Sequence, residues 1–111
     1  MPITNEQILN HRYLPEMYDD GYFPDFLVDK CRAVFVTLCE AIEATKPDVE
    51  ALLKLTTVAT EALNKLQQEF EENESEIETV ARESLCGECD FILKAYGYDV
   101  DVEDAMIERE W

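Results

Sequence analysis

The residues most able to do chemistry in this sequence are the two cysteines of the segment Cys86-Gly87-Glu88-Cys89. Two thiolates separated by two residues can bind one zinc ion, but a tetrahedral zinc site needs two further ligands. The other cysteines are Cys31 and Cys39. On one helix they would lie about 12 Å apart along the axis, too far to share one metal easily. Because a second Cys-x-x-Cys pair is absent, the zinc signal is weak.

The same pair can be interpreted as a redox-active dithiol. Redox motifs of the thioredoxin type place the first cysteine at a helix N-terminus, where the helix dipole lowers the pKa of its thiol. Here the pair is predicted in the middle of a helix, and Glu83, Glu88 and Asp90 would raise the thiol pKa values. A metal-binding or thiol-redox protein using Cys86 and Cys89 is therefore the alternative hypothesis. The simpler interpretation is that these cysteines act as small apolar residues, and we expect no cofactor.

Catalytic groups of other kinds are scarce. His11 is the only histidine, so a di-iron bundle site with a Glu-x-x-His motif on each of two helices is excluded. No segment resembles a nucleophile elbow, and we expect His11 to be a loop residue bonded to a backbone group. The acids of 99–110 have the spacing of a calcium loop, but Asp104 stands where that loop needs Gly. An enzyme that uses carboxylates alone remains open, but no pair of acids can be singled out.

The charge of the chain is its most unusual property. It has 26 Asp and Glu against 9 Lys and Arg, a formal net charge of −17. Such a charge repels phosphate groups and anionic lipids, so we expect no direct binding to nucleic acid or membrane. It favours basic partners, such as cationic proteins, polycations or metal ions. The simpler interpretation is that the charge only keeps the chain soluble.

The sequence also indicates a compartment. No segment approaches the ~20 consecutive apolar residues of a membrane span. The first residues, 1–6, have neither the basic start nor the apolar run of a signal peptide. We therefore expect a cytoplasmic protein, in which the four cysteines would be thiols.

An acidic segment over residues 69–78 contains six acids and no base. The last three acids come near a predicted helix N-terminus, where the helix dipole favours them, whereas the first three come near a C-terminus, where it opposes them. That placement gives no stability and hints at a binding role, although a solvated corner is the simpler interpretation. The candidate protein-binding residues are Glu69, Glu71, Glu72, Glu74, Glu76 and Glu78.

The spacing of apolar residues predicts the elements that would position these groups. Repeats of three and four residues predict long helices over about 24–45, 48–73 and 77–95, with short helices near each end of the chain. Capping boxes are predicted at Thr4–Gln7 and Ser75–Glu78, and Gly97 is the expected left-handed residue after the third long helix. We expect an all-α fold, a small antiparallel bundle of three long and two short helices, as one domain over residues 1–111. The last two long helices should lie side by side, because their connection is short.

Residues 11–23 are predicted to be irregular but apolar, and therefore packed against the core. Their aromatic side chains provide a second candidate interface if several prove exposed in one patch. The residues of this candidate aromatic patch are Tyr18, Tyr22 and Phe23.

Several stretches resemble a small acidic helical bacterial family that is classed as a domain of unknown function. The similar stretches are 13–18, 22–30, 75–79 and 95–99, and the similarity extends to the closing Arg109-Glu110-Trp111. The resemblance implies a bacterial, cytosolic, stand-alone helical protein. It implies no activity and no functional residues.

Together these features favour a non-catalytic protein-binding module over an enzyme. Immunity proteins, toxin inhibitors and nucleic-acid mimics are of this physical type, being small, acidic and without catalytic groups. The expected partner is a basic protein, and such a complex should weaken as salt rises.

Overall fold

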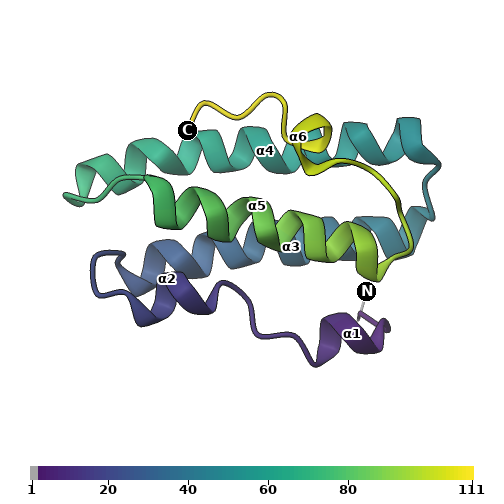
Figure 1. The fold of residues 1–111 in the computed structure, drawn as a ribbon, viewed down its shortest axis with the longest axis horizontal. Coiled ribbons are helices and arrows are strands. Elements are labelled where there is room, and N and C mark those ends of the chain that lie inside the picture. The colour runs from purple at the N-terminus through teal and green to yellow at the C-terminus, as the bar shows by residue number, and fades with distance from the viewer. Residues whose placement is uncertain (1–2) are drawn as a thin grey trace.

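The computed structural model describes residues 3–111, so Met1 and Pro2 of the expected domain lie outside the described residues. No strand occurs in the described part, and the expected all-α fold with three long helices is confirmed (Figure 1). The helices are α1 (Glu6–Leu9), α2 (Pro15–Asp19), α3 (Asp25–Thr45), α4 (Val49–Glu72), α5 (Thr79–Ala95) and α6 (Val102–Ala105).

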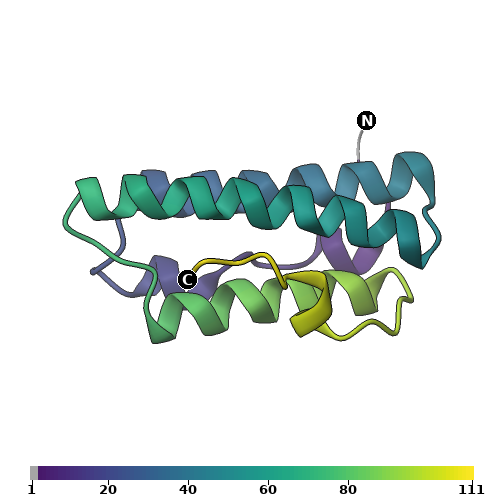
Figure 2. The same cartoon turned by 90° about the horizontal axis from the view of Figure 1, so that it is seen from above.

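The helices form two layers (Figure 2). The antiparallel pair α3 and α4 makes one layer, and α5 with the short helices makes the other. The expectation that the short connection brings α4 and α5 into close contact is wrong. The close neighbours of α5 are α1, α2, α3 and α6, while α4 contacts α3 and α6. One broad face of the α3–α4 layer is therefore left without a helix on it.

Local capping explains where the long helices begin and end. Asp48 caps the start of α4, because its side chain accepts a hydrogen bond from the backbone N–H of Ala51 at 2.9 Å. The predicted left-handed residue after α5 is also confirmed, because Gly97 has φ +82°. This conformation, which glycine adopts without strain, lets the N–H of Tyr98 donate to the carbonyl of Leu93 at 2.9 Å.

The two predicted capping boxes are wrong, because tertiary partners take their hydroxyls. The side chain of Asn5, not Thr4, caps α1, and Thr4 Oγ1 donates to Glu43 on α3 at 2.7 Å. Ser75 Oγ donates to the carbonyl of Tyr22 at 3.2 Å, and α5 begins only after Glu78.

The segment 11–23 is less irregular than predicted, because it contains α2. Pro15 fits the first turn of a helix, where its missing N–H is no loss. Leu14 precedes it in the left-handed region at φ +49° and is buried, so that the chain turns sharply from the extended segment into α2. The described part of the chain therefore has three short helices, one more than the two expected.

The core fills the space between the two layers, largely on the predicted faces. Phe26 and Val80 belong to the apolar repeats of α3 and α5, but both are exposed. Within the described residues, no helix combines the length and apolar character needed to cross a membrane. The largest fully buried side chains include Leu27, Phe35, Leu52, Leu63, Phe70, Leu85, Ile92 and Met106.

Candidate functional site

The predicted acidic residues gather where α4 ends and the chain turns to α5, at the left of Figure 1. Glu69 differs from the others because it is half-buried and forms an ion pair with Lys30 at 2.5 Å. The other five acids are exposed, and within the described chain none of them has a base at ion-pair distance. These five form what we call the acidic corner, which consists of Glu71, Glu72, Glu74, Glu76 and Glu78.

The backbone of the acidic corner is held in a fixed shape. Ser75 is buried at its centre, where its N–H donates to the carbonyl of Phe70 at 2.8 Å. Its hydroxyl bonds the Tyr22 carbonyl, which ties the corner to the α2–α3 connection. Glu74 adopts φ +60°, a left-handed conformation that strains any residue with a Cβ atom. The acids are therefore presented by an ordered turn.

The electrostatics of the acidic corner oppose the placement of Glu71 and Glu72. The last turn of α4 holds Glu71 and Glu72 and no base, so the negative end of the helix dipole faces two carboxylates. Beyond the turn, the pKa of Glu78 is raised by a hydrogen bond that its protonated carboxyl donates to Glu76, and by the negative charge of Glu76. The fold thus concentrates negative charge at this point at a cost in stability.

The three aromatic candidates do not form one exposed patch. Phe23 is buried against Phe70. Tyr18 is half-buried and donates to Asp29, and burial together with that bond raises the pKa of Tyr18 to about 12. Of the three, Tyr22 alone is exposed, so the condition that several of them lie exposed in one patch is not met.

The cysteine pair lies in the middle of α5, as expected, with Cys86 half-buried and Cys89 buried. Burial is the main cause that raises the pKa of both thiols, in Cys89 to about 12. Cys31 and Cys39 are also buried and free, with pKa values raised by burial to about 12 and about 11. The described residues contain no cluster of three His, Cys, Asp or Glu side chains suited to a metal ion. The pair is thus poorly ionised at neutral pH and lacks further ligands.

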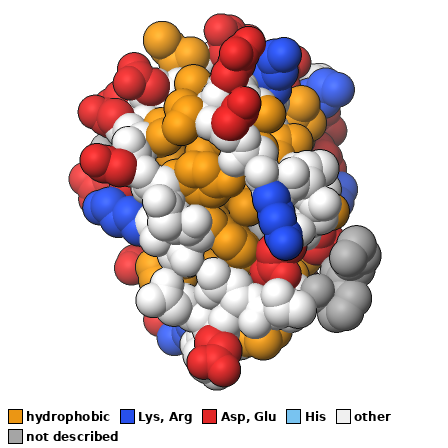
Figure 3. Space-filling view, turned by 90° about the vertical axis from the view of Figure 1, so that its right-hand side faces the viewer, with side chains coloured by type: hydrophobic (Ala, Val, Ile, Leu, Met, Phe, Trp, Pro, Cys, Tyr) orange, Lys and Arg blue, Asp and Glu red, His pale blue; other side chains and the backbone are white. Residues whose placement is uncertain are grey.

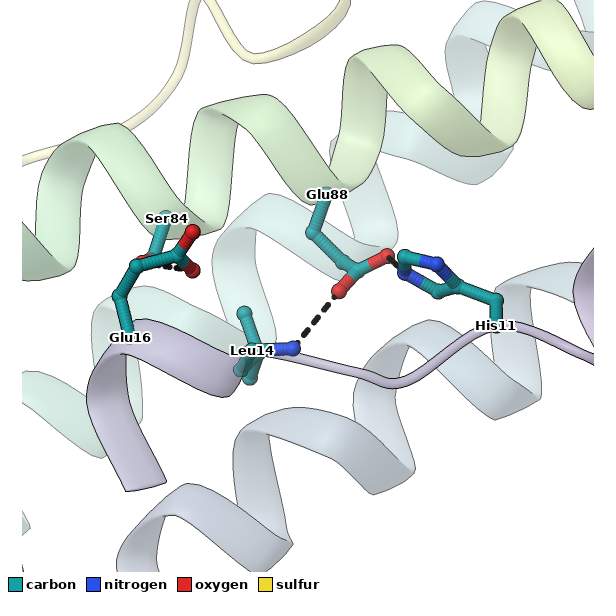
Figure 4. A network of polar contacts seen from close by, with 5 residues as sticks. All are labelled: His11, Leu14, Glu16, Ser84 and Glu88. Carbon is teal, nitrogen blue, oxygen red and sulfur yellow. Dashed lines mark hydrogen bonds and ion pairs between the residues drawn. The ribbon is translucent and has the colours of Figure 1, made fainter. Parts of the chain in front are cut away.

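A polar network that was not predicted connects α5 to the segment before α2 (Figure 4). Glu88, on α5, is 5% exposed, and its Oε2 lies 2.5 Å from Nε2 of His11. Its Oε1 accepts a hydrogen bond from the buried backbone N–H of Leu14 at 3.0 Å. Nearby, the Ser84 hydroxyl donates to Glu16 at 3.2 Å. The expectation that His11 bonds a backbone group is wrong, because its ring bonds Glu88 and stacks on Phe91 at 4.1 Å.

The Glu88 carboxyl and the His11 imidazole form a hydrogen-bonded pair of two titratable groups. Burial raises the pKa of Glu88, although the Leu14 N–H and His11 oppose that shift. In the described chain Glu88 is the only hydrogen-bond partner of the His11 side chain. The pair therefore holds a loop to a helix. A charged residue at position 88 in the apolar series Ala81, Leu85 and Ile92 was the sequence signal for it.

A second polar network that was not predicted lies at the end of the bundle far from the acidic corner. Figure 3 shows this end, with apolar side chains near its centre and charged side chains around them. There Glu43 accepts hydrogen bonds from Tyr96 Oη, from the hydroxyl and N–H of Thr4, and from the N–H of Asn5. Burial opposes ionisation, but these four bonds outweigh it and lower the pKa of Glu43 to about 2. A shallow hollow of about 390 Å³ lies over this cluster. The hydrogen bonds of Glu43 fix Thr4 and Asn5 to α3.

The fold and its polar groups define a small all-helical acidic protein with fixed polar anchors and an unpaired acidic corner. A family model described as "Family of unknown function (DUF5713)" matches residues 7–111. The chain belongs to this family, which confirms the resemblance to a domain of unknown function. Neither the curated proteins nor the solved structures include a match to this chain.

Proposed function

We propose that this protein is a non-catalytic protein-binding module, of an inhibitor-, immunity- or adaptor-like kind, that acts in the cytoplasm. Its partner is a basic protein, and the acidic corner is the surface that binds it. The observation that supports this proposal is that one ordered turn presents five exposed acids without a base at ion-pair distance in the described chain, two of them at the negative end of α4 and one in a strained left-handed conformation.

The cost to stability is the central step of the argument. Acids that serve only solubility are best placed away from helix C-termini and strained turns, because both positions lower stability. Glu71 and Glu72 face the negative end of α4, and Glu74 is held at φ +60°. A bound cationic surface would offset the mutual repulsion and would steer the partner toward the corner.

The charge of the remaining surface makes a nucleic acid or an anionic membrane an unsuitable partner for the corner. Proteins that inhibit basic enzymes are commonly small and acidic, but this likeness is one of charge and size alone. A fixed turn favours a preformed docking surface, since little conformational entropy is lost when it binds.

Capture from extracts of the organism that makes the protein tests this proposal. The five corner residues are changed to Gln in one variant. An equal-charge control carries Gln or Asn at five exposed acids elsewhere, namely Glu6, Glu83, Asp99, Glu108 and Glu110. We expect wild type and control to retain the same basic companion and the corner variant to lose it. A companion that both variants retain equally, or no basic companion at all, contradicts the proposal.

The alternative of a metal-binding or thiol-redox protein receives less support from the geometry. Both Cys86 and Cys89 have raised pKa values, which lowers the thiolate fraction that metal binding and thiol exchange require. No other described side chain joins them in a metal-binding cluster. The reactivity of these thiols is therefore the direct test of this alternative.

A further inference from the structure

The outer face of the α3–α4 layer is apolar at its centre, and no other helix of the described chain covers it. In Figure 2 the other helices all lie on the opposite side of this layer. A hollow of about 360 Å³ runs between α3 and α4, and a second of about 370 Å³ adjoins it. The residues that line them are Lys30, Ala33, Val34, Thr37, Leu38, Ala41, Leu55, Val58, Ala59, Glu61, Ala62, Lys65 and Leu66.

The charge of this lining differs from that of the rest of the molecule. Two lysines, Lys30 and Lys65, and one acid, Glu61, contribute a net charge of +1, whereas the whole chain carries −17. At the centre Val58 is 67% exposed, next to alanines and a threonine that leave room for another helix. This face is apolar and nearly neutral, although the protein is strongly acidic. It can therefore bind another helical surface that is also apolar and nearly neutral.

Five residues of the outer face of α4 are spaced alternately three and four apart, so they form one line on the helix surface, with Lys54, Glu61 and Lys65 on either side of Val58. This outer line is separate from the buried line of α4, which includes Leu52, Ala59, Leu63 and Phe70. The outer line consists of Ala51, Lys54, Val58, Glu61 and Lys65.

We propose that this face binds the same face of a second copy of the chain, in a two-fold dimer whose α3 and α4 helices form a four-helix seam. The two-fold axis runs across the helices at the level of Thr37 and Val58, which line the same hollow. A two-fold axis in this direction reverses the helices, so that α4 runs antiparallel to α4 of the second copy.

The charges along α4 match this arrangement. Lys54 precedes Val58 by about one turn and Glu61 follows it by about one turn, so the axis brings Lys54 opposite Glu61 of the second copy. About one turn further out, Glu50 and Lys65 come opposite each other by the same operation. All four side chains are exposed, and none of them has an ion-pair partner within the described chain. Because of the two-fold symmetry, each of these two ion pairs forms twice. This charge complementarity is the reason for proposing that a second copy of the chain binds this face.

Sedimentation equilibrium at 150 mM salt tests this dimer, because that salt shortens the Debye length to about 8 Å and weakens the repulsion between two acidic molecules. We expect wild type to dimerise reversibly at micromolar concentrations. Val58→Glu should weaken the dimer by at least tenfold. Ile107→Glu serves as its matched control, since Ile107 is 68% exposed on another part of the surface and should not affect dimerisation. Circular dichroism confirms that each variant is folded.

The charge pair provides a second, independent test. Lys54→Glu alone, or Glu61→Lys alone, places like charges opposite each other and should weaken the dimer, whereas the double exchange should restore it. A monomeric wild type at several hundred micromolar overturns the proposal. A dimer that Ile107→Glu disrupts and Val58→Glu does not, or one that the double exchange fails to restore, also overturns it.

Discussion

Glu88 accepts a hydrogen bond from the backbone N–H of Leu14 at 3.0 Å, so that α5 holds the sharp turn by which the chain enters α2. The other oxygen of the same carboxyl bonds His11. Glu88 thus fixes the segment from His11 to Leu14, which is not part of a long helix. The network explains why a charged residue occupies a core position of α5.

The first prediction concerns this network. Glu88→Ala should lower the free energy of unfolding by about 2–4 kcal/mol, because it leaves a buried N–H and the His11 ring without their partner. Glu88→Gln keeps an acceptor for Leu14 and should cost about 1 kcal/mol or less. Urea denaturation measures both, with Asp90→Asn, at an exposed ion pair with Lys94, as the control. Equal losses for Ala and Gln would show that the acceptor is unimportant.

The second prediction concerns the stability at acid pH. The folded pKa of Glu43 is about 2, below its ordinary value of 4.5, so its stabilising contribution is complete above pH 4.5 and is lost as the pH falls toward 2. Wild type should therefore exceed Glu43→Gln in stability above pH 5, and the difference should shrink steadily below pH 4.5. Urea midpoints across this range check it. A difference that does not change with pH would contradict the assigned pKa.

The third prediction concerns the strained turn of the acidic corner. Glu74→Gly should stabilise the fold by about 1 kcal/mol, because glycine adopts φ +60° without the Cβ penalty. Glu76→Gly removes the same charge at a position outside the left-handed region and should give no such gain. Thermal unfolding of the two variants decides the matter. If they shift the melting temperature equally, charge rather than strain is responsible.

The fourth prediction concerns the thiols. In the native protein at pH 7.5, Cys86 should react first with an aromatic disulfide reagent but more slowly than a free thiol, because burial raises its pKa. Cys31, Cys39 and Cys89 should react only on unfolding. Titration before and after adding denaturant measures this. Rapid modification of Cys86 or Cys89, or a stable disulfide between them, would revive the thiol-redox alternative.

The parts of the fold that local pattern determines were predictable. The residues lining the inner faces of α3 and α4 repeat at three and four residues, and Asp48 and Gly97 are local signals for helix ends. The cap of α1 and the start of α5 were missed, because Glu43 and Tyr22 attract the hydroxyls of Thr4 and Ser75 from far along the chain. A capping motif cannot indicate such distant competitors.

For the candidate sites, too, the features that depend on neighbouring residues were predictable, and those that depend on distant contacts were not. The acidic corner lies within one short segment, so its residues could be named from the sequence alone. The contact of His11 with Glu88 spans 77 residues, and the position of Glu88 in the core depends on which face of α5 is buried. The dispersal of Tyr18, Tyr22 and Phe23 likewise depends on how α2 packs, which the sequence pattern of 11–23 did not show.

The most direct test of the central claim is native mass spectrometry of the protein taken at its natural abundance, at low and at moderate salt. The proposed function predicts a complex with one basic protein, and the population of this complex should fall as the salt concentration rises. The variant with Gln at all five residues of the acidic corner should lack the complex at both salt concentrations. A mass with no other protein attached at low salt, or a complex that neither salt nor neutralisation of the acidic corner weakens, would contradict it.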